Sequence, residues 1–460
     1  MEILMRVTQR LPPRTWGTAV SALIVAFVLS ALLITRPGGR TEPEAVPSDG
    51  ASRPERASGH RLTTDTTIET LQSYLSKGPP RADLLAALGE AYLQKARETG
   101  NPAYYPKAET LLRRALELAP GSVEALTGMG ALALARHQFA EALDWGQRAV
   151  QASPHRAAAY GVVADALVEL GRYEEAVTVV QTMVDIRPDQ AAYARVSYLR
   201  ELYGDVEGAI EVMRKAVSAG APNSEGTAYV QVQLGVLLFT VGRFAEAERE
   251  FQIALQRVPN YGRALAGLGL VRASQGDDAA AIDLLTKAVE VMPLPEYVIA
   301  LGDLYERAGR VEEAQRQYEL ARALARLQQA SGTDLDVELA LFEADHGTVD
   351  DAAVARAHSA YARRPSIHAA DALAWTLYRA GRPAEAEPYA REALRLGTKD
   401  PLKLYHAGMI AHALGRTGQA RAWLEQALTL NPQFSILYAA EARRTLDALG
   451  IADAVARGVP

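Results

Sequence analysis

The sequence contains no cysteine in its 460 residues. Disulfide bonds, thiolate metal sites and cysteine nucleophiles are therefore excluded. Aromatic residues are scarce, at 7% of the chain, and the 49 Lys and Arg do not outnumber the 55 Asp and Glu. Because nucleic-acid-binding proteins normally carry a basic excess or stripe, we expect no nucleic acid among the partners.

Signatures of common enzymes and metal sites are also missing. The chain has no Walker phosphate-binding loop and no His-Glu-x-x-His helix. His406 and His412 lie six residues apart in one predicted helix, a poor spacing for two ligands of one metal ion. Two aspartate pairs, at 277–278 and 350–351, open predicted helices, where the helix dipole favours carboxylates. We therefore predict no catalytic residue, no cofactor and no metal site.

One long apolar run lies near the N terminus. The stretch from Trp16 to Ile34 contains no charged residue, and about 20 apolar residues suffice to cross a bilayer core. Trp16 stands at one end, where interfacial aromatic residues lie. A cleaved signal peptide is the alternative, with Val28 and Ser30 before the cut, but the apolar run continues beyond that point. We predict an uncleaved transmembrane helix over residues 16–35.

The orientation of this span rests on its flanking charges. Three arginines lie in the short basic segment of residues 1–15, and Arg36 and Arg40 follow the span. The two sides nearly tie under the positive-inside rule. Because a short basic N terminus ahead of one span usually stays in the cytoplasm, we expect a single-pass cell-membrane protein whose remaining chain is extracytoplasmic.

Residues 36–61 are rich in proline, glycine, serine and charge. Such a composition cannot bury enough apolar surface to offset the entropy lost on ordering. We predict a flexible linker here, followed by a lead-in helix within residues 62–81.

Beyond this segment the sequence repeats. Four prolines are spaced 34 residues apart, at Pro120, Pro154, Pro188 and Pro222. The stretch VELGRYEEAV, residues 168–177, returns with variations around Gly242, Gly309, Gly381 and Gly415. A period of 34 residues with helical composition is typical of a helix-turn-helix solenoid.

Further positions of the repeat specify a family. In residues 297–321 the recurring positions hold Leu301, Gly302, Tyr305, Gly309, Ala314, Tyr318 and Ala321. In residues 234–259 they hold Leu234, Gly235, Gly242, Ala247, Phe251, Ala254 and Pro259. With these residues the chain resembles the tetratricopeptide repeat (TPR) family. The resemblance implies an all-α fold, a right-handed superhelical solenoid of about ten repeats over residues 82–434, with a capping helix and tail in residues 435–460.

The resemblance also implies an inner groove lined by the first helix of each repeat. Aromatic and other large residues at the groove positions are candidate peptide-binding residues, since such side chains dominate binding hot spots. The alternative is that they pack against neighbouring repeats. The candidates are Tyr198, Tyr229 and Phe239 in the central groove, and Trp375, Tyr378, Tyr405 and Met409 in the C-terminal groove.

Two functions remain open at this stage. The first is a membrane-tethered scaffold that binds a peptide or protein segment in the groove. The second is an accessory subunit of an envelope or membrane assembly whose transmembrane helix also contacts partners. A carboxylate clamp for chaperone tails is not expected, because Glu90 and Asp165 stand at the inward positions of the first and third repeats and would repel a carboxylate.

Overall fold

The computed structural model describes residues 63–456. The predicted transmembrane helix of residues 16–35 and the predicted linker lie outside this range. Within residues 63–456, no helix is both long enough and apolar enough to cross a membrane.

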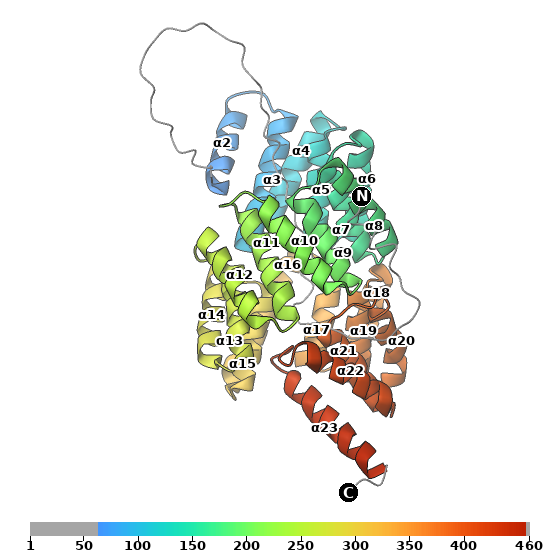
Figure 1. Cartoon of the computed structure of the whole chain (residues 1–460). Coiled ribbons are helices and arrows are strands. Elements are labelled where there is room, and N and C mark those ends of the chain that lie inside the picture. Colours follow the sequence, from blue (N-terminus) through green and yellow to red (C-terminus); the bar gives the residue numbers. More distant parts are fainter. Residues whose placement is uncertain (1–62, 457–460) are drawn as a thin grey trace.

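Every regular element between residues 63 and 456 is a helix, and Figure 1 shows them winding into a coil. The helix α2 (Thr64–Ser76) comes first, ten antiparallel hairpins follow, and α23 (Ala439–Ala456) comes last. The hairpins are α3 (Ala82–Thr99) with α4 (Tyr104–Leu118), α5 (Val123–Ala135) with α6 (Phe139–Ala152), α7 (Ala157–Glu169) with α8 (Tyr173–Ile186), α9 (Gln190–Leu202) with α10 (Val206–Ala219), α11 (Glu225–Thr240) with α12 (Phe244–Arg257), α13 (Gly262–Ser274) with α14 (Asp278–Val291), α15 (Pro295–Arg307) with α16 (Val311–Ala330), α17 (Asp336–His346) with α18 (Asp351–Arg363), α19 (Ile367–Arg379) with α20 (Pro383–Ala393), and α21 (Pro401–Ala413) with α22 (Thr417–Leu430). The predicted all-α helical repeat solenoid is confirmed.

Small residues allow the two helices of a hairpin to pack closely. A Cβ atom at Gly302 of α15 would lie 2.5 Å from the Tyr318 ring of α16, so only glycine fits there. Ala176 of α8 is fully buried at the corresponding crossing of its hairpin. The aspartate pairs behave as predicted, since Asp277 and Asp350 are N-caps whose side chains accept backbone N–H groups of α14 and α18.

The coil closes on itself with a regular offset of five hairpins. The turn inside each of the first five hairpins contacts the link that follows the hairpin five places later, and we call this contact the seam. It joins the turns at Gly100, His137, Gly171, Gly204 and Gly242 to the links at 292–294, 332–334, 364–366, 397 and 430–431, in that order. The second superhelical turn therefore packs against the first.

Buried polar bonds hold the seam. The Arg364 guanidinium lies 2.5 Å from the Glu169 carboxylate and 3.1 Å from that of Glu338. Both Arg364 and Glu169 are buried. The backbone N–H of Ile367 donates to the Tyr173 hydroxyl at 2.9 Å. Because a buried charge is costly without its partner, these bonds fix the register of the two turns.

The segment between α22 and α23 crosses the inner side of the coil, and we call residues 431–438 the C-terminal strap. Asn431 donates through Nδ2 to the carbonyl of Phe239 in α11 at 3.0 Å. Ile436 packs against the hydrophobic core of the α13–α15 region. Tyr438 donates its hydroxyl to Asp345 of α17 at 2.5 Å. The strap therefore spans the inner wall of four hairpins.

Candidate binding cavity

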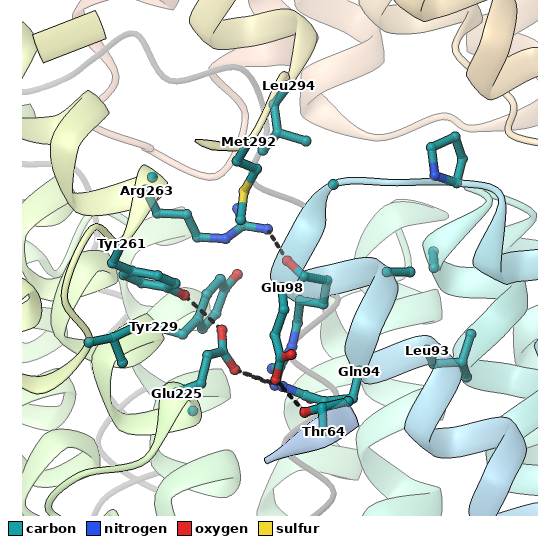
Figure 2. Close-up of a pocket in the computed structure, with 18 of the residues that line it drawn as sticks. Thr64, Leu93, Gln94, Glu98, Glu225, Tyr229, Tyr261, Arg263, Met292 and Leu294 are labelled. Carbon is teal, nitrogen blue, oxygen red and sulfur yellow. Dashed lines mark hydrogen bonds and ion pairs between the residues drawn. The ribbon is translucent and has the colours of Figure 1, made fainter. Parts of the chain in front are cut away.

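A cavity of about 1120 Å³ lies between the first superhelical turn and the start of the second. Its walls come from the start of the described residues, in α2 and α3, and from their middle, in α11, α13, α15, α16 and α17. Figure 2 shows α3 facing the start of α11 and α13 across this space. Typical small-molecule sites occupy roughly 300–1,000 Å³, so the cavity can hold a larger ligand.

An ion pair between two helix ends forms the polar centre of the cavity. Arg97 lies in the last turn of α3, and its Nη2 atom is 2.6 Å from the carboxylate of Glu225, the first residue of α11. Each charge is favoured by the dipole of its own helix. Ser224 caps α11 by accepting the N–H of Thr227, which fixes the direction of Glu225. Gln94 donates to the same carboxylate at 3.0 Å.

Aromatic residues support this ion pair. Tyr261 donates its hydroxyl to Glu225 at 2.7 Å. The guanidinium groups of Arg97 and Arg263 lie 5.8 and 5.4 Å from the centre of the Tyr229 ring. Burial alone would raise the pKa of Glu225, but the Arg97 charge and the hydrogen bonds from Tyr261 and Gln94 hold that pKa below its ordinary value. Glu225 is therefore ionised at neutral pH.

Several buried polar atoms that line the cavity have no partner among the described residues. These atoms are Nε and Nη1 of Arg97, Oγ1 of Thr333 and Oε2 of Glu338. Burial would raise the pKa of Glu338, but Arg364 and His137 lower it well below its usual range. Unsatisfied buried polar atoms are rare in proteins and point to water or a ligand. The cavity thus offers hydrogen-bond donors and acceptors to a bound molecule.

The predicted central groove residues lie in three different surroundings. Tyr229 lines the cavity and is buried. Tyr198 lies at the seam, where its hydroxyl is 3.1 Å from Nε2 of His368. Phe239 is buried beneath the strap, with the ring of Phe244 at 5.4 Å. Only Tyr229 of these three faces the large cavity.

The predicted C-terminal groove residues gather into one cluster. Trp375 stacks on Tyr378 with ring centres 4.9 Å apart and contacts Tyr405 at 5.7 Å. The strap covers them, because Tyr438 lies 5.5 Å from Trp375 and 5.1 Å from Tyr405. Trp375 and Tyr405 are buried, and so is Met409 in the same core.

The expectation of an open groove at these residues needs correction. Sequence reasoning placed them on the inner face of the coil, but the chain's own strap occupies that face. Their role in binding a partner stays a prediction, and binding there would require the strap to move.

Two other polar predictions can be compared with the structure. Asp165 is not a free repulsive charge, because the Arg195 guanidinium lies 2.6 Å from it and both residues are buried. Burial raises the pKa of Asp165 to about 6. His406 lies 3.0 Å from Asp371. Between residues 63 and 456, no group of His, Asp and Glu side chains is arranged to hold a metal ion.

Sequence reasoning missed the residues at the centre of the cavity. Arg97, Glu225, Tyr261 and Arg263 stand at helix ends and not at groove positions. A partial signal was present in the unusually long link before α11, residues 220–224, which brings Glu225 to the cavity. The pairing of Arg97 with Glu225 across four hairpins has no local signal.

Comparison with known proteins supports the repeat assignment. Two models of the tetratricopeptide repeat match this chain, one at residues 133–197 and the other at residues 103–157, 232–292 and 372–433. The matched segments fall on hairpins of the structure, and the chain contains tetratricopeptide repeats.

A curated relative is the cellulose synthase 1 operon protein C of Komagataeibacter xylinus, 25% identical over 267 residues. The match covers 58% of this chain but 17% of that protein, so the relative is much longer than the shared region.

Similar solved structures include YrrB, described as a TPR protein with an unusual peptide-binding site. It is 17% identical, with 40% of this chain and 92% of YrrB covered and a TM-score of 0.27. A second is the APC/C hetero-tetramer Cut9–Hcn1, 13% identical over 84% of this chain and 93% of that chain, with a TM-score of 0.36.

Proposed function

We propose that this tetratricopeptide repeat protein is a non-enzymatic scaffold that binds a peptide or protein segment in the cavity between α3, α11 and α13. The observation that carries the proposal is the cavity itself, which combines a large volume with a few converging polar groups. A peptide backbone carries both carbonyl acceptors and N–H donors. It would therefore match the unpartnered atoms of Arg97 and Glu338.

Membrane tethering is part of the same proposal. The predicted span of residues 16–35 would hold the repeats at the bilayer through the linker of residues 36–61. Thr63 and Thr64 line the cavity rim, so the linker would join the repeats beside the binding site. A segment bound there would stay within a few nanometres of the membrane.

Peptide selection tests the binding function. The full chain in detergent is immobilised and presented with random dodecapeptides displayed on phage. We expect recovered peptides to lose binding to Ala219→Trp, because Ala219 is exposed towards the cavity and a tryptophan would fill it. Ala279→Trp, an exposed site of α14 away from the cavity and the seam, is the control. Peptides that bind both variants equally well would refute the cavity as the site.

A second candidate is an accessory subunit of an envelope assembly. It is supported by the likeness to a protein named for a cellulose synthase operon. Replacing residues 16–35 with an unrelated apolar span of equal length separates the two functions. A scaffold would keep its cross-linked partners in cells, whereas an assembly subunit that uses its span for contacts would lose them.

The membrane side of the repeats can be tested with one cysteine. The chain has none of its own, so Ser52→Cys in the predicted linker is an unambiguous label. We expect a membrane-impermeant maleimide to label intact cells. Labelling only after lysis would place the repeats in the cytoplasm and contradict the proposed orientation.

A further inference from the structure

A second space, of about 100 Å³, lies in the inner wall of the coil. It is enclosed by α11, α13 and α15 and by the C-terminal strap, and its lining includes Val232, Phe239, Leu270 and Ala300. We call it the apolar slot. Dry apolar cavities of about 150 Å³ are known to take up benzene, so this volume suits one aliphatic side chain of the size of leucine, isoleucine or methionine.

The slot adjoins the large cavity. Arg263, Glu296 and Ile299 line both spaces. A segment bound in the cavity could therefore place one side chain in the slot without any movement of the helices.

The strap indicates which chemistry this wall accepts. Its Phe434 is buried against the aromatic cluster, and its Ile436 packs on the α13–α15 core. Both side chains also line the slot. The inner wall thus already binds a segment of turns through two apolar side chains, and the slot is a further position of the same kind.

The junction of the two spaces holds the acidic side chain of Glu296 beside the basic side chain of Arg263. The charges of Arg263 and His137 act on the Glu296 carboxyl. Burial raises its pKa above the ordinary value, although the Arg263 charge opposes the shift. A cation on the ligand would stabilise the ionised carboxylate at this point.

We propose that the apolar slot is the specificity pocket of the binding cavity, and that it selects a segment with a Leu, Ile or Met side chain next to a Lys or Arg. The apolar side chain enters the slot, and the cation pairs with Glu296 at its mouth. This inference rests on the proposed peptide-binding function and adds the sequence preference of the site.

The phage selection described above provides the probe. We expect recovered dodecapeptides to be enriched in an aliphatic residue adjacent to a basic one. Ala300→Phe would fill the slot and weaken a synthetic copy of the best peptide on the order of ten- to one-hundredfold, the value of burying one aliphatic side chain. Ala323→Phe, the same change on an exposed face of α16, is the matched control and should leave affinity unchanged.

A double-mutant cycle between Glu296 and the basic residue of the peptide tests the preference for a cation. Glu296→Gln should weaken the basic peptide about tenfold and should not affect a peptide whose basic residue is replaced by glutamine. Glu290→Gln, an exposed residue of α14, is the control. Unchanged unfolding midpoints would show that the variants are folded.

The outcomes separate the two levels of the proposal. Peptides that bind in the cavity, lose binding with Ala219→Trp and ignore Ala300→Phe would overturn the slot and leave the binding function intact. A selection that yields no peptide dependent on the cavity would overturn both.

Discussion

Two glycines of the same turn motif, Gly171 and Gly381, have different surroundings. Both have left-handed backbone conformations, with φ of 71° and 73°. A methyl group at Gly171 would overlap the carbonyl oxygen of Pro365 across the seam, whereas nothing lies within 4 Å of the corresponding position at Gly381. Glycine is therefore required at Gly171 for two reasons, the left-handed backbone and the close contact across the seam. At Gly381 only the left-handed backbone requires it.

This difference predicts unequal effects of one substitution. Gly381→Ala should cost about 1–2 kcal/mol, the strain of a left-handed alanine. Gly171→Ala should cost at least ~3 kcal/mol, because the link at Pro365 must also move. Urea unfolding of the full chain measures both values. Equal losses would mean that the seam is open in solution.

A single carboxyl group at the seam should make stability depend on pH. Burial, reinforced by the charge of Asp400 and opposed by Lys403, raises the pKa of Glu201 to about 7. The folded state therefore holds a proton that the unfolded state releases near pH 4.5, so stability falls as pH rises from about 4.5 to 7.

The matching variant is Glu201→Gln, which mimics the protonated form. It should stabilise the protein on the order of 2 kcal/mol at pH 8 and hardly at all at pH 4.5. Thermal unfolding at the two pH values tests this. A gain that is the same at both would assign the effect to packing and not to titration.

Single elements were predictable from the sequence to the extent that their signals are local. The prolines and glycines 34 residues apart mark the hairpins, and α8 begins at Tyr173 with Glu174 and Glu175 in its first turn, as the motif requires. The inner-face position of Trp375 also followed from the repeat. The position of the strap over Trp375 could not be predicted, because it depends on contacts with helices far away in the sequence.

The seam does leave a trace at the start of the second helix of each hairpin. In the first five hairpins this residue is apolar or aromatic: Tyr104, Phe139, Tyr173, Val206 and Phe244. In the last five it is Asp278, Val311, Asp351, Pro383 and Thr417. Two members of the first set contact the second superhelical turn: the Arg364 guanidinium lies 4.7 Å from the centre of the Phe139 ring, and the Ile367 N–H donates to the Tyr173 hydroxyl. A pattern that changes halfway through a repeat array can therefore indicate that the array closes on itself.

The elements at the seam depend on the buried ion pair of Glu169 with Arg364. Arg364→Ala would leave Glu169 buried without its partner, so we expect a loss of about 3–5 kcal/mol. Arg382→Ala removes an exposed pair with Glu385 and should cost at most about 1 kcal/mol. Chemical unfolding of both variants provides the comparison. Similar small losses would show that the Arg364 pair contributes little to closure.

At the scale of the whole molecule, the seam changes how the repeats share stability. In an ordinary solenoid each repeat contacts only its neighbours, and stability is a sum of nearest-neighbour terms. Here each of the first five hairpins also contacts the link that follows the hairpin five places later. The two superhelical turns should therefore unfold together. The strap and the cavity walls should unfold with them in the same transition.

Opening can be followed as a distance between two spin labels. Ala140→Cys and Gln329→Cys are exposed positions on opposite sides of the seam, near the hydrogen bond from Gln138 to the Gly332 carbonyl. We expect one narrow distance distribution in the otherwise unchanged chain. Adding Arg364→Ala and Asn431→Ala removes two seam contacts and should create a second, longer population.

A pair of labels within the first turn, Glu117→Cys with Gln147→Cys, is the control. Its distance should not change, because adjacent hairpins hold it. A broad distribution before any seam residue is altered would mean that the coil is open at rest, and the inner aromatic cluster would then be accessible to partners without displacement of the strap.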